Sequence, residues 1–500
     1  MKSSSDDSDV SAVGQAGILV LIGSVFGMFS DFLFRVILSN IVDADIFGAV
    51  FLILSLVNII AIPCLLGMNQ GIVKYIPESN TSNRNSYILF SMICSTIACV
   101  IISVFILIYP GDIIYTLLNV EERIYLYFLI LLLPFYSLYE ISLSSLRGLM
   151  KTDHHVILKN LAHPILKISI LGGAAWIFGT LLPILASLLL VFIISAVIGV
   201  FFLLRSRWRP KMSLSINYTS FIYFSLPLMV SSSIYILLKN VDKVLIGSFL
   251  NTASVGEYEV AITIATLLGI FQTSFSFLLY PKISDLISQK KSGKIPHLYT
   301  QATKWIFLFT LPPYLILVTR PNALVSLFGD QYSISTLSIP LAILATGYFL
   351  DAILGPNGQA LLGLGRSRAI LIYNMIAIFI NIPLNIMLIP SHGLIGAALA
   401  TITGYITMNL LKSADLWMNY RIPSIHTSTA IILISVSPIC VLLLNIFPEY
   451  GSVVYEIAIL SLSSVISIVI GIVSLSAFGC VSASDKKLAQ DSLKKLTNIV

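Results

Sequence analysis

Residues 231–251 read SSSIYILLKNVDKVLIGSFLN and carry Lys239, Asp242 and Lys243 within an otherwise apolar run. The run covers about residues 218–250, which as a helix rising ~1.5 Å per residue is long enough to cross a bilayer. The spacing i, i+3, i+4 places the three charges on one helix face. A charge at the bilayer centre costs at least ~2.5–3.5 kcal/mol, so such groups normally face a bundle interior or a watery cavity. Two interpretations stay open: Asp242 neutralises a lysine in a structural pair, or the three line a net-positive transport path. We prefer the second because one lysine is left over.

The composition of the whole chain indicates a membrane protein. Of its 500 residues, 57% are hydrophobic and only 10% are charged, whereas a soluble domain is roughly 25% charged. Residues 1–10 are polar and acidic and lack the basic start of a cleaved signal peptide, so we expect the first apolar run to remain as a membrane helix. The five cysteines lie mostly in apolar runs, without a CxxC or His/Cys cluster, so neither disulfides nor a metal site is expected.

About 14 apolar runs are long enough to cross a bilayer, and several are long enough to tilt. They cover roughly residues 14–40, 46–73, 87–109, 124–146, 155–178, 180–204, 217–249, 253–281, 303–319, 334–363, 367–389, 393–417, 426–447 and 454–478. We therefore expect an all-α polytopic membrane protein with about 14 transmembrane helices.

The lysines and arginines are distributed unequally between the two sides of these runs. With the N-terminus in the cytoplasm, 23 of the 29 fall on inside segments and only 2, Arg123 and Arg320, on outside segments. The other four lie within spans: Arg35, Lys167, Lys239 and Lys243. Because cytoplasmic loops carry an excess of these residues, we expect a multi-pass protein of the plasma (inner) membrane with both termini in the cytoplasm. The net charge of +6 follows from this bias and does not indicate nucleic-acid binding.

Two pairs of segments suggest an internal repeat. Residues 40–51 resemble residues 249–260 when Gly48 is aligned with Gly256, at an offset of 208. A second pair matches at an offset near 214, between residues 146–160 and 362–374. Spans one to six and seven to twelve would then form two pseudo-symmetric six-helix lobes, as in many transporters. The expected order is a cytoplasmic tail (1–13), an N-lobe (14–205), a basic cytoplasmic linker (206–216), a C-lobe (217–418), two further helices (419–480) and a cytoplasmic tail (481–500).

The chain resembles a known transporter family over about 480 residues. The resemblance is carried by the opening segment 14–40, then DIFGAV at 45–50, NVDKVLIGSFL at 240–250, VGEYEVA at 255–261, and ALLGLGRSR at 360–368 followed by Asn374. These segments are similar to the polysaccharide-export branch of the MATE/MOP superfamily, the O-antigen and lipid-linked oligosaccharide flippases. The resemblance implies a V-shaped pair of six-helix lobes with two added helices. It also implies export of a polyprenyl- or dolichyl-linked glycan from the inner to the outer leaflet.

Such a substrate has an anionic phosphate or pyrophosphate, so its path needs cations. The candidates for phosphate binding are the four cations within spans: Arg35, Lys167, Lys239 and Lys243. Together with Asp31 and Asp242 they leave a mid-membrane surplus of two positive charges, which suits a phosphate and disfavours a cationic drug. Asp31 and Arg35 lie one turn apart, so a structural ion pair between them is the alternative.

Other polar residues are candidates for lining the cavity or for coupling transport to an ion: Asp31, Asp242, His163, Asp351, Asn357, Gln359 and Asn381. His163 lies between Lys159 and Lys167 at a spacing that predicts a basic stripe, although a hydrogen-bonded interior histidine is equally expected. The sequence GPNGQ at 355–359 should break its helix and free backbone groups, either as a polar lining or as a hinge. Glu257 is a possible partner for Lys243.

The sequence therefore predicts a flippase that works by alternating access, without a cofactor. It has no Walker A motif and no motif of a hydrolytic enzyme. An ion-coupled multidrug or cation antiporter of the same superfamily is the alternative, but it should have a dominant buried carboxylate rather than surplus lysine. A membrane glycosyltransferase or polymerase would need larger outside loops. The expected partners are a lipid-linked glycan, membrane lipids, and a glycan polymerase or ligase of the same pathway.

Overall fold

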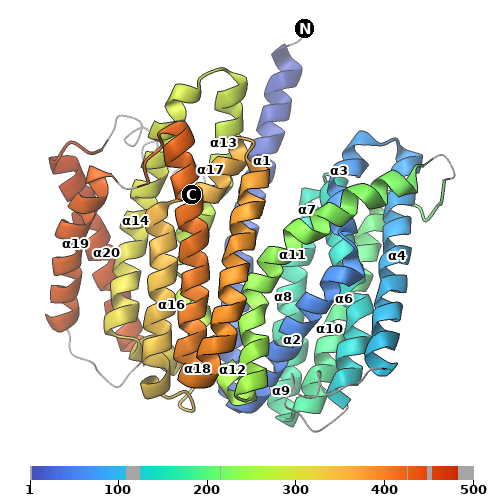
Figure 1. Cartoon of the computed structure of the whole chain (residues 1–500), viewed down its shortest axis with the longest axis horizontal. Coiled ribbons are helices and arrows are strands. Elements are labelled where there is room, and N and C mark those ends of the chain that lie inside the picture. The colour runs from blue at the N-terminus through green and yellow to red at the C-terminus, as the bar shows by residue number, and fades with distance from the viewer. Residues whose placement is uncertain (1–2, 109–123, 214–215, 425, 447–452, 482–500) are drawn as a thin grey trace. The chain divides into compact units, whose positions relative to one another are not determined.

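The computed structural model describes residues 3–108, 124–213, 216–424, 426–446 and 453–481, and every regular element in these ranges is a helix (Figure 1). The longer helices are α1 (Ser3–Ile41), α2 (Ala44–Leu65), α3 (Met68–Glu78), α4 (Thr81–Ile108), α6 (Ile124–Gly148), α10 (Leu181–Arg205), α11 (Tyr218–Phe249), α12 (Thr252–Thr266), α13 (Gly269–Ser288), α14 (Ile295–Thr319), α16 (Ile334–Leu354), α18 (Ser367–Tyr420), α19 (Thr427–Ile446) and α20 (Val453–Ala477). Between α6 and α10 lie five short pieces: α7 (Thr152–Val156), η1 (Ile157–Ala162), α8 (His163–Leu166), η2 (Lys167–Leu171) and α9 (Gly172–Phe178). The other short helices are η3 (Ser292–Lys294), α15 (Asn322–Val325), η4 (Ser326–Phe328) and α17 (Asn357–Gly363).

The number of membrane spans agrees with the sequence. Twelve helices among the described residues are long and apolar enough to cross a membrane, and α12 with α13, bent by 53°, forms a thirteenth if the pair is one span. The twelve include α18 as a single helix, although Gly393 (φ 56°, ψ −133°) interrupts it. Counting the two halves of α18 separately adds one more span, which agrees with the expected number of about 14.

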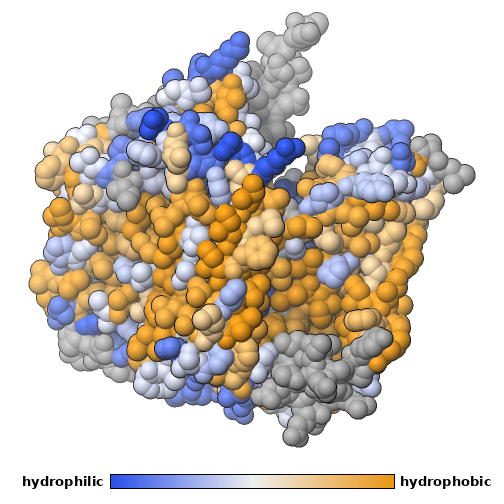
Figure 2. All heavy atoms as spheres, in the orientation of Figure 1, coloured by the Kyte–Doolittle hydropathy of each residue, from blue (hydrophilic) through white to orange (hydrophobic). Residues whose placement is uncertain are grey.

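The middle parts of the helices are apolar, and their charged residues lie mostly near the helix ends. α10 is almost entirely apolar and contains no charged residue before Arg205 in its last turn. On the face that Figure 2 shows, apolar side chains cover the middle of the helices, and hydrophilic side chains gather near the helix ends. This distribution is typical of helices whose middle parts contact lipid.

The helices divide into two compact units. The first consists of Met1–Thr263, Phe328–Pro340 and Asn374–Gly404, and the second of Ile264–Leu327, Leu341–Tyr373 and Tyr405–Val500. These boundaries are not those of the lobes expected from the sequence, and the predicted division at 205 and 217 stays a prediction. The predicted N-terminal tail is helical from Ser3 on, and the predicted C-terminal tail lies outside the described residues except for Val481.

In the first unit, α6 packs against α10, α4, α3 and α2, and α11 packs against α2 and α3. Small residues allow some of these helices to come very close. A Cβ added to Gly199 of α10 would lie 2.7 Å from the Cβ of Ser142 in α6. Helix interfaces within membranes favour such residues because they bring backbones together.

The tightest approach in the first unit is between α2 and α12. A Cβ on Gly48 would lie 1.8 Å from the carbonyl oxygen of Thr252, and a Cβ on Gly256 would lie 2.6 Å from the carbonyl oxygen of Ala44. The Thr252 hydroxyl also donates a hydrogen bond of 2.8 Å to Asp45. The two glycines that the internal repeat aligns are therefore in contact with each other's helices.

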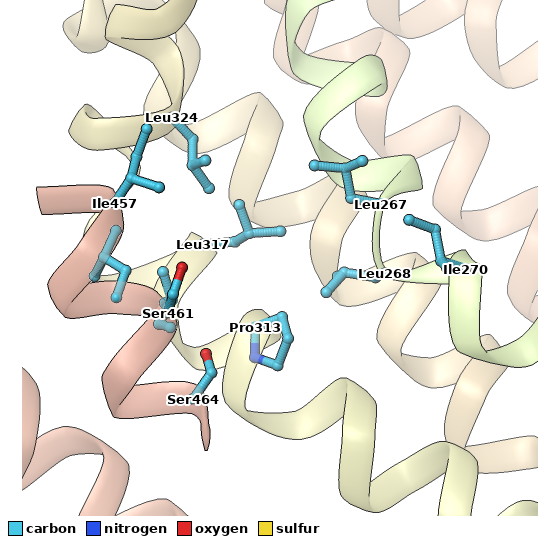
Figure 3. Close-up of a pocket in the computed structure, with 11 residues that line it drawn as sticks. Leu267, Leu268, Ile270, Pro313, Leu317, Leu324, Ile457, Ser461 and Ser464 are labelled. Carbon is cyan, nitrogen blue, oxygen red and sulfur yellow. The ribbon is translucent and has the colours of Figure 1, made fainter. Parts of the chain in front are cut away.

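In the second unit, α14 packs against α13, α19 and α20. Its core includes the stacked rings of Tyr314 and Phe349, whose centroids lie 4.0 Å apart. A cavity of about 270 Å³ lies among α14, α15, α20 and the bend between α12 and α13 (Figure 3). Its lining is apolar except for the hydroxyl groups of Ser461 and Ser464.

The helix break expected at 355–359 is present. α16 ends at Leu354 and α17 begins at Asn357, with Gly355 at φ +74° between them. The hydroxyl of Tyr299 donates a hydrogen bond to the carbonyl oxygen of Leu354, which the break leaves without a helical partner.

Candidate functional site

Five charged side chains of the first unit form a continuous chain of ion pairs in the order Lys167, Asp31, Arg35, Glu259, Lys243. The Nζ of Lys167 lies 3.2 Å from Oδ1 of Asp31, and Nη2 of Arg35 lies 3.0 Å from its Oδ2. Arg35 also contacts Oε1 of Glu259, whose Oε2 lies 3.0 Å from the Nζ of Lys243. The chain of ion pairs joins α1 and η2 to the consecutive helices α11 and α12, which lie far from both in the sequence.

The members of this chain differ in exposure. The side chain of Glu259 is 1% exposed, those of Lys243, Lys167 and Arg35 are 12%, 17% and 21% exposed, and that of Asp31 is 39% exposed. Glu259 therefore holds its two cations from the protein interior, while the cations keep part of their surface accessible. An anion that reaches them meets hydrogen-bond donors already fixed in place.

Aromatic rings and a hydroxyl complete the surroundings of the cations. The guanidinium carbon of Arg35 lies 4.8 Å from the ring centre of Phe51, and its Nη1 donates a 3.0 Å hydrogen bond to Thr263. The Nζ of Lys167 lies 5.5 Å from the ring centre of Phe34. These contacts orient the cations without neutralising them.

Lys239 lies apart from this chain. Its side chain is exposed, with Nζ 4.6 Å from the ring centre of Tyr235, and it forms no ion pair with a carboxylate among the described residues. Its neighbour one turn on, Lys243, is instead paired with Glu259. The three charged residues of α11 thus lie on one side of the helix but have different surroundings: Lys239 is exposed, Lys243 is paired with Glu259, and Asp242 is buried.

Asp242 is satisfied by uncharged donors. It is 1% exposed and accepts hydrogen bonds from the amide of Asn385 at 2.9 Å, from the hydroxyl of Tyr258 at 3.2 Å and from the hydroxyl of Thr401. The interpretation in which Asp242 pairs with a lysine is wrong, because the carboxylate that contacts Lys243 is Glu259.

Two asparagines lie beside this carboxylate on α18. Asn381 and Asn385 are buried, and the amide of Asn385 also donates to the backbone carbonyl of Asn381 at 3.1 Å. Among the described residues, neither side-chain oxygen has a hydrogen-bond donor. The first unit thus places Asn385 on Asp242, with the predicted residue Asn381 one turn away on the same helix.

His163 lies in the interior of the first unit. Its Nδ1 is 2.9 Å from the hydroxyl of Ser195, and its ring stacks on Tyr139 with centroids 4.8 Å apart. Lys159 is exposed, whereas His163 is buried and hydrogen-bonded to Ser195, so the three residues do not form one continuous basic stripe.

The remaining predicted residues belong to the second unit. Asn357 donates hydrogen bonds to the backbone carbonyl of Asn409 at 3.3 Å and to the hydroxyl of Ser413 at 3.2 Å, so its amide serves packing. Asp351 has Gln272 and Asn409 as hydrogen-bond partners and Lys412 as a neighbouring cation. Gln359 is half-buried, with no hydrogen bond to its side chain among those that the described residues form.

A further ion pair of the second unit lies at the start of α18. Nη2 of Arg366 lies 3.0 Å from Oδ1 of Asp415, and the hydroxyl of Tyr373 donates to Asp415 at 3.0 Å. The hydrogen bond and charge of Asp415 raise the pKa of Arg366, which lies outside the spans. This pair joins the two ends of α18 near the loop that follows α17.

Glu259 is the functional candidate that the sequence reasoning missed. The segment VGEYEVA offers two glutamates, and Glu257 was the expected partner of Lys243. Helical spacing held the missing signal, since residues 256, 259 and 263 follow i, i+3, i+7 and share one face. The glycine at 256 packs against α2, so the face that carries Glu259 points inward.

Comparison with protein-family profiles gives two matches. The profile described as "Polysaccharide biosynthesis protein" matches residues 13–287, and the profile MatE matches residues 227–387. The chain is 24% identical over 405 residues to Agl15 of Haloferax volcanii, named as a "probable low-salt glycan biosynthesis flippase"; the match covers 80% of this chain and 83% of that protein.

Solved structures show the same fold. The lipid II flippase MurJ in an inward closed conformation superposes with a TM-score of 0.73 at 18% identity, covering 90% of this chain and 98% of MurJ. An inward-facing multidrug resistance MATE family transporter of the MOP superfamily gives a TM-score of 0.61 at 16% identity, covering 81% of this chain and 98% of that one. The fold expected from the sequence is confirmed as that of a multi-pass membrane transporter, and the class as transporter rather than enzyme.

Proposed function

Because the chain belongs to the polysaccharide biosynthesis protein family of the MATE/MOP superfamily, we propose that it is a flippase for a lipid-linked glycan. The substrate is a polyprenyl- or dolichyl-linked oligosaccharide with a phosphate or pyrophosphate at the junction. The protein moves it from the cytoplasmic to the outer leaflet by alternating access. The product serves cell-surface polysaccharide or glycoprotein synthesis.

The single observation that carries this proposal is the chain of ion pairs within the spans. Three of the four predicted cations, Arg35, Lys167 and Lys243, come together from α1, η2 and α11 and stay partly accessible. Each has hydrogen-bond donors of the kind that bind phosphate oxygens, and Arg35, whose Nε and Nη2 contact Asp31, can offer a further N–H. Cations within a membrane span are costly, so their retention favours a role in binding an anion.

The names of relatives support the same class of substrate. Agl15 is named for glycan biosynthesis, and MurJ is a flippase for lipid II. Lys239, exposed and unpaired with any described carboxylate, is proposed as the first cation that the phosphate meets.

We propose that Asp31 or Asp242, both candidates from the sequence, couples transport to the binding of a proton or a cation. Asp242 lies in a pocket of uncharged donors and asparagine oxygens, and Asp31 is the most exposed carboxylate of the ion-pair chain. A proton or cation at either site would alter the charge next to the phosphate. The lobe organisation, the cytoplasmic termini and association with a glycan polymerase or ligase belong to the same proposal.

The second candidate is an ion-coupled multidrug or cation antiporter. It is favoured by the match of the MatE profile to residues 227–387 and by the buried carboxylate of Asp242. It is disfavoured by the surplus of positive charge around Arg35, which repels a cationic drug. The two candidates therefore differ in the charge of the molecule transported.

Reconstitution tests the choice. The purified protein is placed in liposomes with a fluorescent lipid-linked oligosaccharide, and the fraction that an impermeant reagent can reach in the outer leaflet is followed with time. We expect transfer between leaflets well above that of protein-free liposomes. Absence of transfer, together with uptake of a cationic dye against an ion gradient, would favour the antiporter.

A further inference from the structure

We propose that Glu259 sets the number of negative charges that the site accepts, and that the site takes a single phosphate in preference to a pyrophosphate. This inference rests on the proposed function, because it concerns the junction between lipid and sugar in the same substrate. It names a specificity-determining residue and narrows the class of substrate.

The ion-pair chain carries one surplus positive charge. It contains three cations (Arg35, Lys167 and Lys243) and two carboxylates (Asp31 and Glu259). Lys239 and Asp242 flank Lys243 on α11 without joining the ion-pair chain, and they cancel each other in the count. Without Glu259, the same count leaves two positive charges. Glu259 is the buried one of the two carboxylates that hold the count at one.

The position of Glu259 makes its charge a permanent part of the site. Its side chain is 1% exposed and is held between Arg35 and Lys243. The hydroxyl of Thr263, one turn further on α12, donates to the backbone carbonyl of Glu259 and accepts a hydrogen bond from Nη1 of Arg35. A substrate approaches from the accessible side of the cations, so it cannot displace Glu259 without leaving a buried charge unpaired, which is strongly unfavourable.

Electrostatics then favours one charge on the substrate. A sugar joined to a lipid through one phosphate is a phosphodiester with one negative charge, whereas the pyrophosphate linkage carries two. The phosphodiester brings the loaded site to neutrality, and the pyrophosphate leaves it with an unbalanced negative charge. Unbalanced charge is costly in a site of low dielectric constant.

Other titratable groups near the chain do not alter this count. Tyr258 of α12 donates its hydroxyl to Asp242, and His163 of α8 is buried with its Nδ1 on the hydroxyl of Ser195. Burial disfavours the charged form of a histidine. Glu140 of α6 and Lys159 of η1 have opposite formal charges, so together they leave the count unchanged.

The test compares two synthetic ligands that differ only in the junction: glucosyl farnesyl phosphate and glucosyl farnesyl diphosphate. Their affinities are measured for the full chain in nanodiscs of phosphatidylcholine, which has no net charge and does not compete as an anion. The readout is the ratio of the two dissociation constants. For the wild-type protein we expect tighter binding of the phosphate.

A series of variants changes the net charge of the site in known steps. Glu259→Gln and Asp31→Asn each raise it by one, Glu259→Asp keeps it, and the double variant Glu259→Gln with Lys243→Gln restores it. The first two should shift the ratio about tenfold towards the diphosphate, equal to ~1.4 kcal/mol. The last two should keep the wild-type preference. A purely structural role of Glu259 would weaken both ligands equally and leave the ratio unchanged.

The possible outcomes distinguish a failure of the proposed flippase function from a failure of the proposed role of Glu259. Failure of the wild-type protein to bind either ligand would contradict the phosphate site itself and with it the proposed function. Binding of both with a preference for the diphosphate, or a ratio that stays the same in folded Glu259→Gln and Asp31→Asn proteins, would overturn the role of Glu259 while the flippase proposal stands. If Glu259→Gln does not fold, Asp31→Asn and the double variant decide the question.

Discussion

Arg35 is the residue on which the site depends, because it contacts both Asp31 and Glu259 and also lies over Phe51. A single side chain thus connects the two carboxylates that balance the lysines on either side. Its planar guanidinium has five donors, so it can hold both carboxylates and still offer an N–H to a phosphate. A lysine in its place would lack this geometry.

The first prediction concerns the lysines of α11. Replacing Lys239 and Lys243 together by glutamine should abolish export, because the phosphate loses two donors, while insertion into the membrane is retained. The measurement is complementation of a strain lacking the gene, with expression checked in membrane fractions. Lys151→Gln, which removes an exposed lysine between α6 and α7, is the control and should export normally. Normal export by the well-expressed double variant would contradict the phosphate role of these lysines.

The second prediction separates interior packing from cavity lining at His163. His163→Phe keeps a ring against Tyr139 and removes the hydrogen bond to Ser195. We expect the free energy of unfolding to fall by about 1–3 kcal/mol, with Ser195 left unpaired, and the loss to be largely recovered when Ser195→Ala is added. Transport by the folded single variant should persist. A loss of transport that Ser195→Ala does not restore would place His163 in the substrate path.

At the scale of residues, the sequence predicted which cations belong to the site, but not which carboxylates pair with them. The rule that charges within spans are functional selected Arg35, Lys167 and Lys243, which do meet. It did not select Glu259 over Glu257, because that choice needs the knowledge that the face of α12 with Gly256 packs inward. It also placed His163 on a basic stripe, whereas the ring is buried against Ser195 and Tyr139.

At the scale of elements, α2 and α12 cross so closely at Gly48 and Gly256 that neither position has room for a side chain. The two glycines are the positions that the repeat expected from the sequence aligns, and equivalent positions of two repeats meet where a two-fold axis passes between them. We therefore propose this crossing as the pivot about which the two lobes expected from the sequence rock.

The third prediction follows from this geometry. Gly48→Ala would place a Cβ 1.8 Å from a backbone oxygen, so the helices must separate. We expect the free energy of unfolding to fall by about 1–3 kcal/mol or more and transport to fall with it. Gly173→Ala is the matched control, because a Cβ there meets nothing within 4 Å. Equal stability and transport in the two variants, measured by thermal unfolding and by leaflet transfer, would contradict a tight crossing.

The breaks within helices were predictable where glycine and proline coincide. The sequence GPNGQ predicted the end of α16, and the gap between the expected spans 367–389 and 393–417 coincides with the break at Gly393 in α18. The bend between α12 and α13 lies at Leu267 and Leu268, directly before Gly269, within the one span expected at 253–281. A glycine without a proline beside it did not by itself predict this bend.

At the scale of the whole molecule, the fourth prediction concerns the orientation in the membrane that the distribution of lysine and arginine indicates. With the five native cysteines replaced, a single cysteine at Lys291 should react with an impermeant maleimide only after the cells are permeabilised. A cysteine at Asp330 should react in intact cells. Both residues are exposed and lie in loops between spans, so accessibility reports the side of the membrane. The reverse labelling would contradict the orientation expected from the 23 inside and 2 outside residues.

The number of spans and the fold class were predictable because apolar length and charge distribution determine them directly. The division into units was not, since Asn374–Gly404 of α18 packs with the first unit although more than a hundred residues of sequence separate it from Thr263. Asn385 reaches Asp242 through that association. A repeat in the sequence shows which segments are related, but not which of them pack together.

The central claim is that the protein carries a lipid-linked glycan across the membrane on its intramembrane cations. The most direct measurement is the leaflet occupied by that glycan in cells that lack the gene, probed by an impermeant sugar-modifying reagent. We expect the glycan to accumulate in the cytoplasmic leaflet, the wild-type gene to restore its exposure, and the gene with Lys243→Gln to fail to do so. An unchanged distribution in the cells without the gene would contradict the claim, and new sensitivity to cationic drugs in those cells would move the assignment to the antiporter.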